Sequence, residues 1–537
     1  MSGTAVTPTA GGSQRDAAPA VAKRAGGWRT PAGASIAFFT IVALGLRVFM
    51  ISRPGYLLGV TQYDDGPYFG SAVRLVHGVL PYRDFIIVQP PGITVLMSPA
   101  ALLSDVTGTA WGMAAGRILT VAASTISVLL AGLLVRHRGL TAVTVCCGIL
   151  AVYPGSLIAA HTVFLEPWLV LLCLIGALAV FDGDKFASNR RLMWGGVAFG
   201  VAGAVEVWAV LPVAAIALLL LPRLKRLARF VAGVAVGFLI PVVPFAALAP
   251  ATFYKSFFAA QLLRVVPHRT PVWYRLKLMT GLAKILHLSN TGVLTVSLII
   301  VAFIVAAYAI SWLVTRRPPA PLDWFAAAST AIVSIAFLWY AQFFLHFPAF
   351  LAPFLALALG LGSSRLVRAV APAASRIGIR GWARWPLVSI VGALVVVLAV
   401  QQGRTQSNVS TRVSPAGLTA ARRIIPPGAC VLTDQVSFTI AANRFTSGVP
   451  GCSRLVDSIG TDYALGHGRD ALSGAGRYTA VGSLWRRAFD HASFVWLSSR
   501  NARRIPWTPG LTAYFTSHFH RVYTDGSRDV LYARKHG

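Results

Sequence analysis

Charged residues are scarce in this chain of 537 residues. They make up 12% of it, against about 25% in soluble globular proteins, whereas hydrophobic residues make up 56%. The five cysteines are too few for a disulfide-rich scaffold, and no CxxC or HExxH spacing indicates a zinc site. These shortages exclude an ordinary soluble enzyme and predict one large helical protein that crosses a membrane many times.

Motifs for nucleotide binding are also missing. The chain has no Walker loop, no dinucleotide-binding glycine fingerprint and no repeat of fixed period, which argues against an ATP-driven pump. The net charge of +31 could indicate a nucleic acid or a membrane surface as partner. Most basic residues fall at predicted membrane boundaries, in one outer loop or in the C-terminal tail. We therefore expect contact with membrane lipids and no nucleic acid.

Eleven apolar segments are predicted to span the membrane. With the N-terminus in the cytoplasm, every loop predicted on the inside is basic, as the positive-inside rule requires. Merging the two short segments on either side of Glu206 would break this alternation. The odd number places the C-terminus outside, in a multi-pass protein of, we expect, a bacterial plasma membrane. The segments lie at about 34–52, 111–135, 140–158, 164–181, 192–205, 208–221, 229–247, 291–314, 322–341, 347–363 and 386–401.

The chain is predicted to have three parts. Residues 1–33, rich in small residues and proline, form a disordered cytoplasmic N-terminus. Residues 34–401 form the transmembrane body, with outer loops at about 53–110 and 248–290. Residues 402–537 form a small extracytoplasmic α/β domain, because strand-like runs alternate there with helical stretches.

The tail also holds two of the cysteines. Cys430 and Cys452 lie on the side of the membrane that is predicted to be oxidising, so they are candidates for a disulfide. One strand-like run begins at Cys430 and another covers Phe494–Leu497. The remaining cysteines fall within predicted spans, where they serve as packing residues.

Acidic residues are so few that each is informative. The chain has 17, and only two of them are Glu. Asp64 and Asp65 stand together at the start of the first outer loop, in the run YDDGPY. Adjacent carboxylates repel, so one can act as a base while the other binds a metal or hydroxyl groups. The simpler alternative is that an Asp caps a helix expected over 66–77.

Further motifs follow this pair in order. The run GVLPYRD ends at Asp84, the run QPPG begins at Gln89, and Glu166 stands at the outer end of a later span. This order resembles the GT-C superfamily of polytopic glycosyltransferases, in particular the protein O-mannosyltransferase and lipid A aminoarabinose-transferase branches. The resemblance covers roughly residues 34–365. It implies a GT-C-like helical fold and an inverting transfer of one sugar from a polyprenyl-phosphate donor to an acceptor on the outer face.

Such a transfer needs a base for the acceptor hydroxyl, whereas the phosphate leaves without much acid assistance. By resemblance Asp64 is expected to be this base, with Asp65 a close second. Glu166, Asp84 and Gln89 are expected to bind the acceptor or to supply a second carboxylate. Helix capping is the alternative role of Glu166. A divalent cation held by the two aspartates is left open.

Cations are expected to bind the donor phosphate. The outer loop at 248–290 supplies Arg264, His268 and Arg269, and the short outer turn before the span at 347–363 supplies His346. The alternatives are contact with anionic headgroups for the loop residues and a plain interfacial position for His346. Arg264 and His268 are the preferred phosphate ligands.

The abundance of Arg, Ala and Gly is typical of a GC-rich genome and suggests an actinobacterial source. Mannose and arabinose are therefore the favoured sugars, for cell-wall biogenesis. The acceptor could be a glycan, a glycolipid or a protein, and the tail could bind it or cover the site. The alternatives to a transferase are a transporter or flippase of a lipid-linked glycan and a non-catalytic scaffold that displays the tail.

Overall fold

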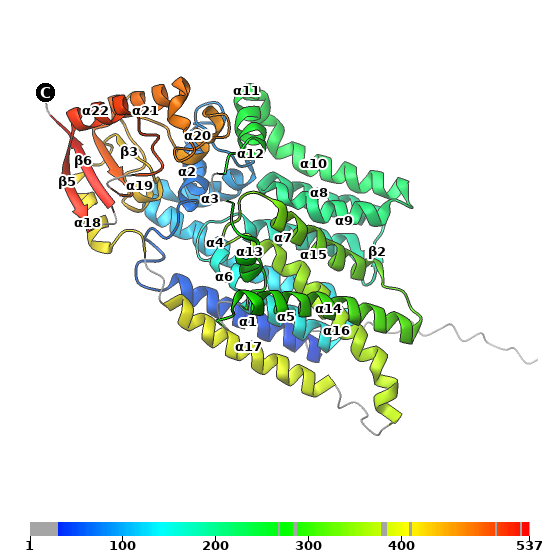
Figure 1. Cartoon of the computed structure of the whole chain (residues 1–537). Helices are drawn as coiled ribbons and strands as arrows, with labels where there is room; N and C mark the ends of the chain where they lie inside the picture. Colours follow the sequence, from blue (N-terminus) through cyan, green and yellow to red (C-terminus); the bar gives the residue numbers. More distant parts are fainter. Residues whose placement is uncertain are drawn as a thin grey trace, which may run out of the picture.

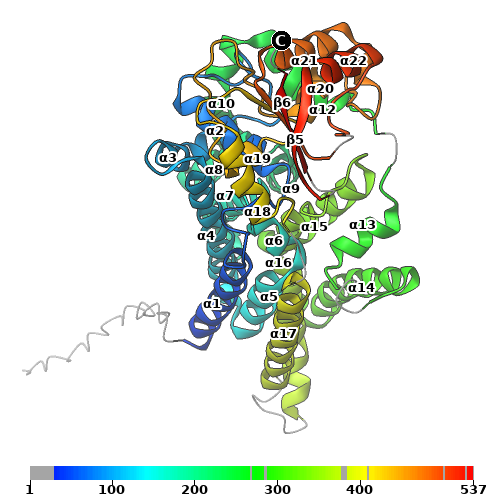
Figure 2. The ribbon, with the colours of Figure 1, turned by 90° about the vertical axis from the view of Figure 1, so that its left-hand side faces the viewer.

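The computed structural model describes residues 30–266, 269–282, 287–376, 384–407, 411–499, 502–526 and 529–535. A large body of helices carries a smaller part that contains a four-stranded sheet (Figure 1). The sheet lies at one end of the bundle, where α1 and α17 also end (Figure 2).

Within the described residues, seven helices are long and apolar enough to cross a membrane. An eighth span results if the bent pair α5 (Leu140–Val152) and α6 (Pro154–Ala160) counts as one, with a bend of 52°. Proline 154 explains this bend, because the residue before a proline is driven to extended backbone and Tyr153 has ψ of 122°. The seven helices are α1 (Pro31–Ile51), α4 (Thr109–Val135), α10 (Leu224–Leu248), α14 (Asn290–Thr315), α15 (Pro321–Trp339), α16 (Pro348–Arg376) and α17 (Arg384–Ser407).

Three shorter helices account for the other predicted spans. They are α7 (Glu166–Val180), α8 (Asn189–Val205) and α9 (Val210–Leu220), the last preceded by the short turn η2 (Val207–Ala209). All eleven predicted segments thus coincide with a helix or with the bent pair. Seven or eight meet the requirement of length and composition, and eleven crossings stay a prediction.

Helices α8 and α10 pack with their backbones in contact. A Cβ atom on Gly200 would lie 2.1 Å from the carbonyl oxygen of Val234, and one on Gly237 would lie 2.1 Å from that of Val197. Gly196 and Gly233 repeat the pattern four residues earlier on each helix, which is the small-xxx-small spacing of close membrane helix pairs. This contact fixes the short helix α8, and so the turn that follows it at Glu206.

The first outer loop forms two helices, α2 (Asp65–Val76) and α3 (Gly92–Thr107). Helix α2 coincides with the helix expected over 66–77. Phe69, Ile93 and Met97 from these helices share a hydrophobic core with Phe164. Gly92 is needed where α3 begins, because a Cβ atom there would lie 2.3 Å from the carbonyl oxygen of Ala204.

The second outer loop is helical in short pieces. These are α11 (Pro250–Phe253), the π-helical turn η3 (Tyr254–Ala259), α12 (Ala260–Leu262) and α13 (Val272–Met279). Phe253 and Phe257 are buried, whereas Tyr254, Phe258 and Leu262 are exposed. An apolar rim of this kind suits the membrane interface.

The C-terminal part contains a mixed sheet in the order β3-β4-β6-β5, with β3 parallel to β4 and the other pairs antiparallel. The two strand-like runs of the sequence overlap β3 and β4. Trp485 and Phe489 fill the core between sheet and helices. The elements are α18 (Pro415–Ile424), β3 (Val431–Thr433), α19 (Ser437–Ala441), α20 (Ser458–Leu465), η4 (Ala475–Arg477), α21 (Thr479–His491), β4 (Phe494–Leu497), α22 (Pro509–His518), β5 (Phe519–Asp525) and β6 (Asp529–Arg534).

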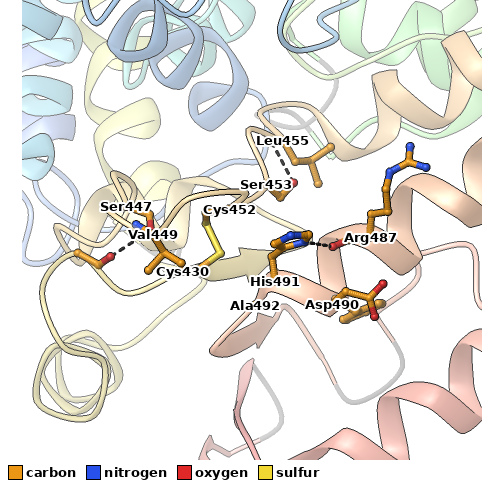
Figure 3. Close-up of a disulfide and its surroundings, with 12 residues drawn as sticks. Cys430, Ser447, Val449, Cys452, Ser453, Leu455, Arg487, Asp490, His491 and Ala492 are labelled. Carbon is orange, nitrogen blue, oxygen red and sulfur yellow. Dashed lines mark hydrogen bonds between the residues drawn. A yellow bond between two sulfur atoms is a disulfide. The ribbon is translucent and has the colours of Figure 1, made fainter.

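Cys430 and Cys452 form a disulfide in the C-terminal part (Figure 3). The bond joins the residue before β3 to the loop that leads to α20, and it closes a loop with a sequence separation of 22. The other three cysteines, Cys146, Cys147 and Cys173, are buried and unbonded to one another.

The C-terminal part is docked on the first outer loop. Val436 and Ile440 belong to the same hydrophobic core as α2 and α3. Thr109 donates a hydrogen bond of 2.8 Å from Oγ1 to the Ile440 carbonyl, and the Ala110 N–H donates one of 2.8 Å to Asn443 Oδ1. The two parts therefore share buried contacts, and the loop that begins at Asp64 lies between them.

Candidate active site

The two adjacent aspartates lie in opposite environments. Asp65 is 0% exposed, and both of its carboxylate oxygens are bonded. Its Oδ2 accepts from Arg117 Nη2 at 2.8 Å and from Thr162 Oγ1 at 2.7 Å, and its Oδ1 accepts from Ser437 Oγ at 2.7 Å. Asp65 therefore ties α2 to α4, to the segment before α7 and to α19.

Arg117 is the cation that neutralises Asp65. It is 1% exposed, and it also donates to Thr162 Oγ1 at 3.0 Å and to the carbonyls of Tyr56 and Leu57 at 2.8 and 2.7 Å. A buried ion pair is stable only with such additional hydrogen bonds. The Arg117–Asp65 ion pair thus has a structural role and holds the start of the loop in place.

The carboxyl group of Asp64 is accessible, whereas both carboxylate oxygens of Asp65 have hydrogen-bond partners. The side chain of Asp64 is 37% exposed, and it makes no cap hydrogen bond to α2 and no hydrogen bond to any other described residue. The only charged group within 4 Å among those residues is His346, with Nε2 3.9 Å from Oδ2. Partial desolvation of the carboxyl group by the surrounding protein raises the pKa of Asp64 to about 6. The charge of His346 opposes this shift, whereas the charges of Asp457, Asp65 and Glu166 act in the same direction.

His346 lies between Asp64 and Glu166. Its Nδ1 is 2.6 Å from Glu166 Oε1, and its ring stacks on Phe164 with 4.3 Å between centroids. Burial by itself lowers the pKa of His346, but the Glu166 and Asp64 carboxylates outweigh it and the net shift is upward. The imidazolium is therefore favoured, and the three side chains form a carboxylate–imidazolium–carboxylate row.

Glu166 also faces a small internal cavity. Its Oε2 has no hydrogen-bond partner among the described residues, and the same holds for Nη2 of Arg47 in α1. Both residues line this cavity together with Ser124 and Ser156, and it leaves about 10 Å³ for the centre of a water molecule. That is room for one ordered water between two groups of opposite charge.

Arg47 is a residue that we did not predict. An arginine inside the apolar run at 34–52 is the signal that could have revealed it, because charges within membrane helices are rare and mark functional contacts. Its Nε donates to Ser124 Oγ at 2.8 Å.

Two further acids contribute to the site, Glu206 through its interaction with Glu166 and Asp457 through its interaction with Asp64. Burial, followed by the charge of Glu166, raises the pKa of Glu206 to about 8, so this side chain is neutral at pH 7. Asp457 comes from the C-terminal part, where its Oδ1 accepts from Tyr63 Oη at 2.9 Å and caps α20 through the Gly460 N–H at 2.8 Å. No local pattern could have revealed Asp457, because it is joined to its partner across 394 residues.

Arg264 lies where both outer loops and the C-terminal part meet. Its Nη1 donates to Gln342 Oε1 at 2.5 Å, and its guanidinium carbon is 4.3 Å from the centroid of the Tyr463 ring. Its charge lowers the pKa of Glu206 and Asp457, although burial dominates both and raises them. Arg264 is therefore a cation close to the acids around Asp64.

Arg269 has a different position. Its Nη2 donates to the carbonyls of Leu338 and Trp339 at 3.2 and 2.6 Å, at the C-terminal end of α15. Arg275, another cation of this loop, is fully buried and donates to the Phe337 carbonyl at 2.8 Å. Both arginines thus satisfy helix-end carbonyls. The remaining predicted phosphate ligand, His268, lies outside the described residues.

Asp84 and Gln89 shape the loop between α2 and α3. Asp84 Oδ2 accepts from the Leu80 N–H at 2.7 Å and pairs with Arg83 at 2.8 Å, and the hydrogen bond from Arg83 lowers the pKa of Asp84. Gln89 Nε2 lies 3.5 Å from the hydroxyl of Tyr68. Asp84 therefore closes a turn, and the one hydrogen bond of the Gln89 side chain to a described residue is the bond to Tyr68.

Metal-ligand clusters are absent from the described part of the chain, where no group of three or more His, Cys, Asp or Glu side chains is placed to hold an ion. The aspartate pair offers one open carboxylate, because Asp65 is occupied by Arg117, Thr162 and Ser437.

Comparison with known proteins supports the fold. No family model and no curated protein matches the sequence. Among solved structures, ArnT from Cupriavidus metallidurans bound to undecaprenyl phosphate is similar, with a TM-score of 0.56 and 13% identity over 93% of this chain and 98% of that one. The apo oligosaccharyltransferase of Archaeoglobus fulgidus has a TM-score of 0.52 and 13% identity over 94% of this chain and 74% of that one.

Both neighbours are membrane glycosyltransferases of the GT-C superfamily. At this identity the likeness shows the fold alone, and that fold is the GT-C type that the order of motifs predicted. Membership of the superfamily, the branch within it and the actinobacterial source stay predictions.

Proposed function

We propose that this protein is an inverting glycosyltransferase that moves one sugar from a polyprenyl-phosphate donor to a hydroxyl of a cell-envelope acceptor on the outer face of the membrane. One observation carries the proposal. Of two adjacent aspartates, one is locked by an arginine and two hydroxyls, and the other is left open beside a histidine. A fold alone would not need the open carboxylate, because desolvating it costs stability.

Asp64 is the proposed general base. Its carboxylate takes the proton of the acceptor hydroxyl as the oxygen attacks the anomeric carbon. The bond from that carbon to the phosphate oxygen breaks, and its electron pair leaves with the polyprenyl phosphate. A pKa of about 6 leaves most of Asp64 ionised at pH 7 while keeping it basic enough to accept a proton.

The other site residues position this base and its substrates. The imidazolium of His346 lies 3.9 Å from Asp64 and is itself held by Glu166, so it sets where the base can point. Arg264 is the proposed ligand of the donor phosphate. The solved complex of ArnT with undecaprenyl phosphate supports a lipid phosphate of this class as donor. Mannose and arabinose are the proposed sugars.

A donor screen tests the proposal. The purified full chain, in lipid nanodiscs, is given polyprenyl-phosphate donors labelled in mannose, arabinose or aminoarabinose, together with cell-envelope acceptor glycans. We expect transfer from one donor, with inversion of the anomeric centre in the product. Asp64→Asn should lower this transfer by about 10²–10⁴-fold, the usual contribution of a general base.

The matched control is Asp105→Asn, an exposed aspartate of the same outer loop whose one ion-pair partner in the described part of the chain is His77. We expect full activity from it. Movement of a lipid-linked glycan across proteoliposomes without any bond being formed would contradict the proposal and favour a flippase.

A further inference from the structure

A cleft in the C-terminal part lies apart from Asp64 and its neighbours. Its volume is about 340 Å³, and it opens between α20, the turn that follows α20 and the loop after β4. We call it the tail cleft. Its polar lining comes from Asp462, Asp470, Ser498, Ser499, Arg503 and Arg504.

Asp462 is the buried polar group of the tail cleft. It is 0% exposed, and its Oδ1 accepts from Trp485 Nε1 at 2.9 Å. Its Oδ2 has no hydrogen-bond partner in the part of the chain that the structure describes. Burial raises the pKa of Asp462 well above its usual range. A buried polar atom without a partner is rare in folded proteins, and here it borders a cleft that a ligand can enter.

The charges around the tail cleft nearly cancel. Arg504 is paired with Asp434 at 3.3 Å, and Asp434 also accepts from the Ser498 N–H at 2.7 Å. Asp470 is held by Ser473, whose N–H and hydroxyl donate to Oδ1 at 2.8 and 2.7 Å. Arg503 is exposed and has no ion pair among the described residues.

A lining of this kind suits a neutral ligand with many hydroxyl groups. Hydroxyls both donate and accept, and the tail cleft offers guanidinium donors, a carboxylate acceptor and serine hydroxyls. A phosphate or a polyanion would need an excess of positive charge, which the pairing of Arg504 removes.

Residues that line the tail cleft contact residues next to the proposed active site. The guanidinium carbon of Arg504 lies 4.7 Å from the centroid of the Tyr63 ring, and the Ile459 N–H donates to Tyr63 Oη at 3.1 Å. Tyr63 directly precedes Asp64. On the opposite side, Asp470 accepts from Tyr463 Oη at 3.1 Å, and Tyr463 lies against Arg264.

We propose that the tail cleft binds the non-reacting sugar units of a neutral oligosaccharide acceptor while its terminal hydroxyl lies at Asp64. This inference rests on the proposed glycosyl transfer and names the acceptor class as a glycan. It assigns the C-terminal part a role in acceptor recognition.

Binding to the purified full chain tests the inference. Mannotetraose and a linear arabinan hexasaccharide are titrated separately, with ligand-observed NMR as the readout. We expect one of them to bind with Kd of about 10 mM or tighter. Ala471→Trp places a large side chain in the tail cleft from a partly exposed position and should weaken binding at least tenfold. Arg503→Ala removes one set of donors and should weaken binding about threefold, roughly one lost hydrogen bond.

The matched control is Arg487→Ala, an exposed arginine on α21 that does not line the cleft. We expect its affinity to equal that of the wild type. Absence of binding by either oligosaccharide, or equal affinity in Ala471→Trp and the wild type, overturns the inference.

Donor hydrolysis, with water as acceptor, separates this inference from the proposed function. Ala471→Trp should hydrolyse the labelled donor at the wild-type rate and lose only transfer to the oligosaccharide. Asp64→Asn should lose both reactions and still bind the oligosaccharide. If neither the wild type nor any variant turns over the donor, the proposed function is contradicted. If the donor is turned over and Ala471→Trp transfers sugar to the oligosaccharide as well as the wild type does, only the role of the tail cleft is contradicted.

Discussion

The acidic residues at the two ends of the helical body differ in the partners that surround them. At the end predicted to be cytoplasmic, Asp323 is buried between Arg138 and Arg365, with both nitrogen–oxygen distances at 2.9 Å. Asp184, between the short strands β1 (Phe181–Asp182) and β2 (Lys185–Phe186), pairs with His137 and Arg138. Partial burial opposes these partners, but their hydrogen bonds lower the pKa of Asp184 to about 2.

At the opposite end, Asp64 makes no close ion pair, and its nearest basic group in the described part of the chain is His346 at 3.9 Å. Burial raises the pKa of Asp64 to about 6, the charges of Asp457, Asp65 and Glu166 act in the same direction, and Glu166 also raises the pKa of Glu206. Acids that serve only stability are paired. A cluster of unpaired or underpaired acids is typical of a catalytic site. The contrast therefore teaches more about function than the number of acids does.

The largest expected effect comes from breaking the Arg117–Asp65 ion pair beside the proposed active site. Asp65→Ala leaves Arg117 charged and buried, which should cost about 3–5 kcal/mol of stability. Thermal unfolding in detergent measures this loss. Asp323→Ala, at the other end of the body, should behave similarly, because it leaves the buried Arg365 without its carboxylate and leaves Arg138 with Asp184 alone. A melting temperature equal to that of the wild type in both variants would contradict the reading of these acids as structural.

A smaller effect separates two arginines of the same loop. Arg264→Ala should raise KM for the lipid-phosphate donor by about tenfold, roughly the loss of one charged hydrogen bond, with little change in stability. Arg269→Ala removes a partner of the α15 carbonyls and should lower the melting temperature while leaving the donor KM unchanged. The reverse pattern would assign the donor phosphate to Arg269.

The smallest effect concerns the pH dependence. Transfer should fall as the pH drops through about 6, because Asp64 becomes protonated and can no longer accept a proton. Asp457→Asn removes a negative charge that raises the pKa of Asp64, so the acid limb of log kcat/KM should move to lower pH. Profiles from pH 4.5 to 8 measure both. An acid limb that moves upward in Asp457→Asn would contradict the cluster.

The sequence predicted the helical body because apolar runs and their basic flanks are local signals. It also singled out Asp64, Glu166 and His346, which the fold brings together, although they lie far apart in the chain. It did not separate Asp64 from Asp65, because that difference depends on Thr162 and Ser437, which approach only in the folded protein. Asp457 and the tail cleft could not be predicted from the sequence for the same reason.

The phosphate ligands show a second limit. Arg264, Arg269 and Arg275 have the same chemistry and lie in the same loop. The sequence grouped Arg264 with Arg269, but the fold directs Arg269 and Arg275 to the end of α15 and Arg264 to Gln342. The packing of the helix decides which of its carbonyls lack partners, and the sequence of the loop carries no signal for it.

Sugar transfer per folded molecule in Asp64→Asn and Asp65→Asn tests the central claim most directly. Both variants change one oxygen to an amide in adjacent residues, and the folded fraction is measured by size-exclusion chromatography and thermal unfolding. We predict that Asp64→Asn stays folded and loses transfer, whereas Asp65→Asn loses stability and keeps transfer in the molecules that fold. Full transfer in Asp64→Asn, with transfer lost in well-folded Asp65→Asn, would contradict the assignment of the base.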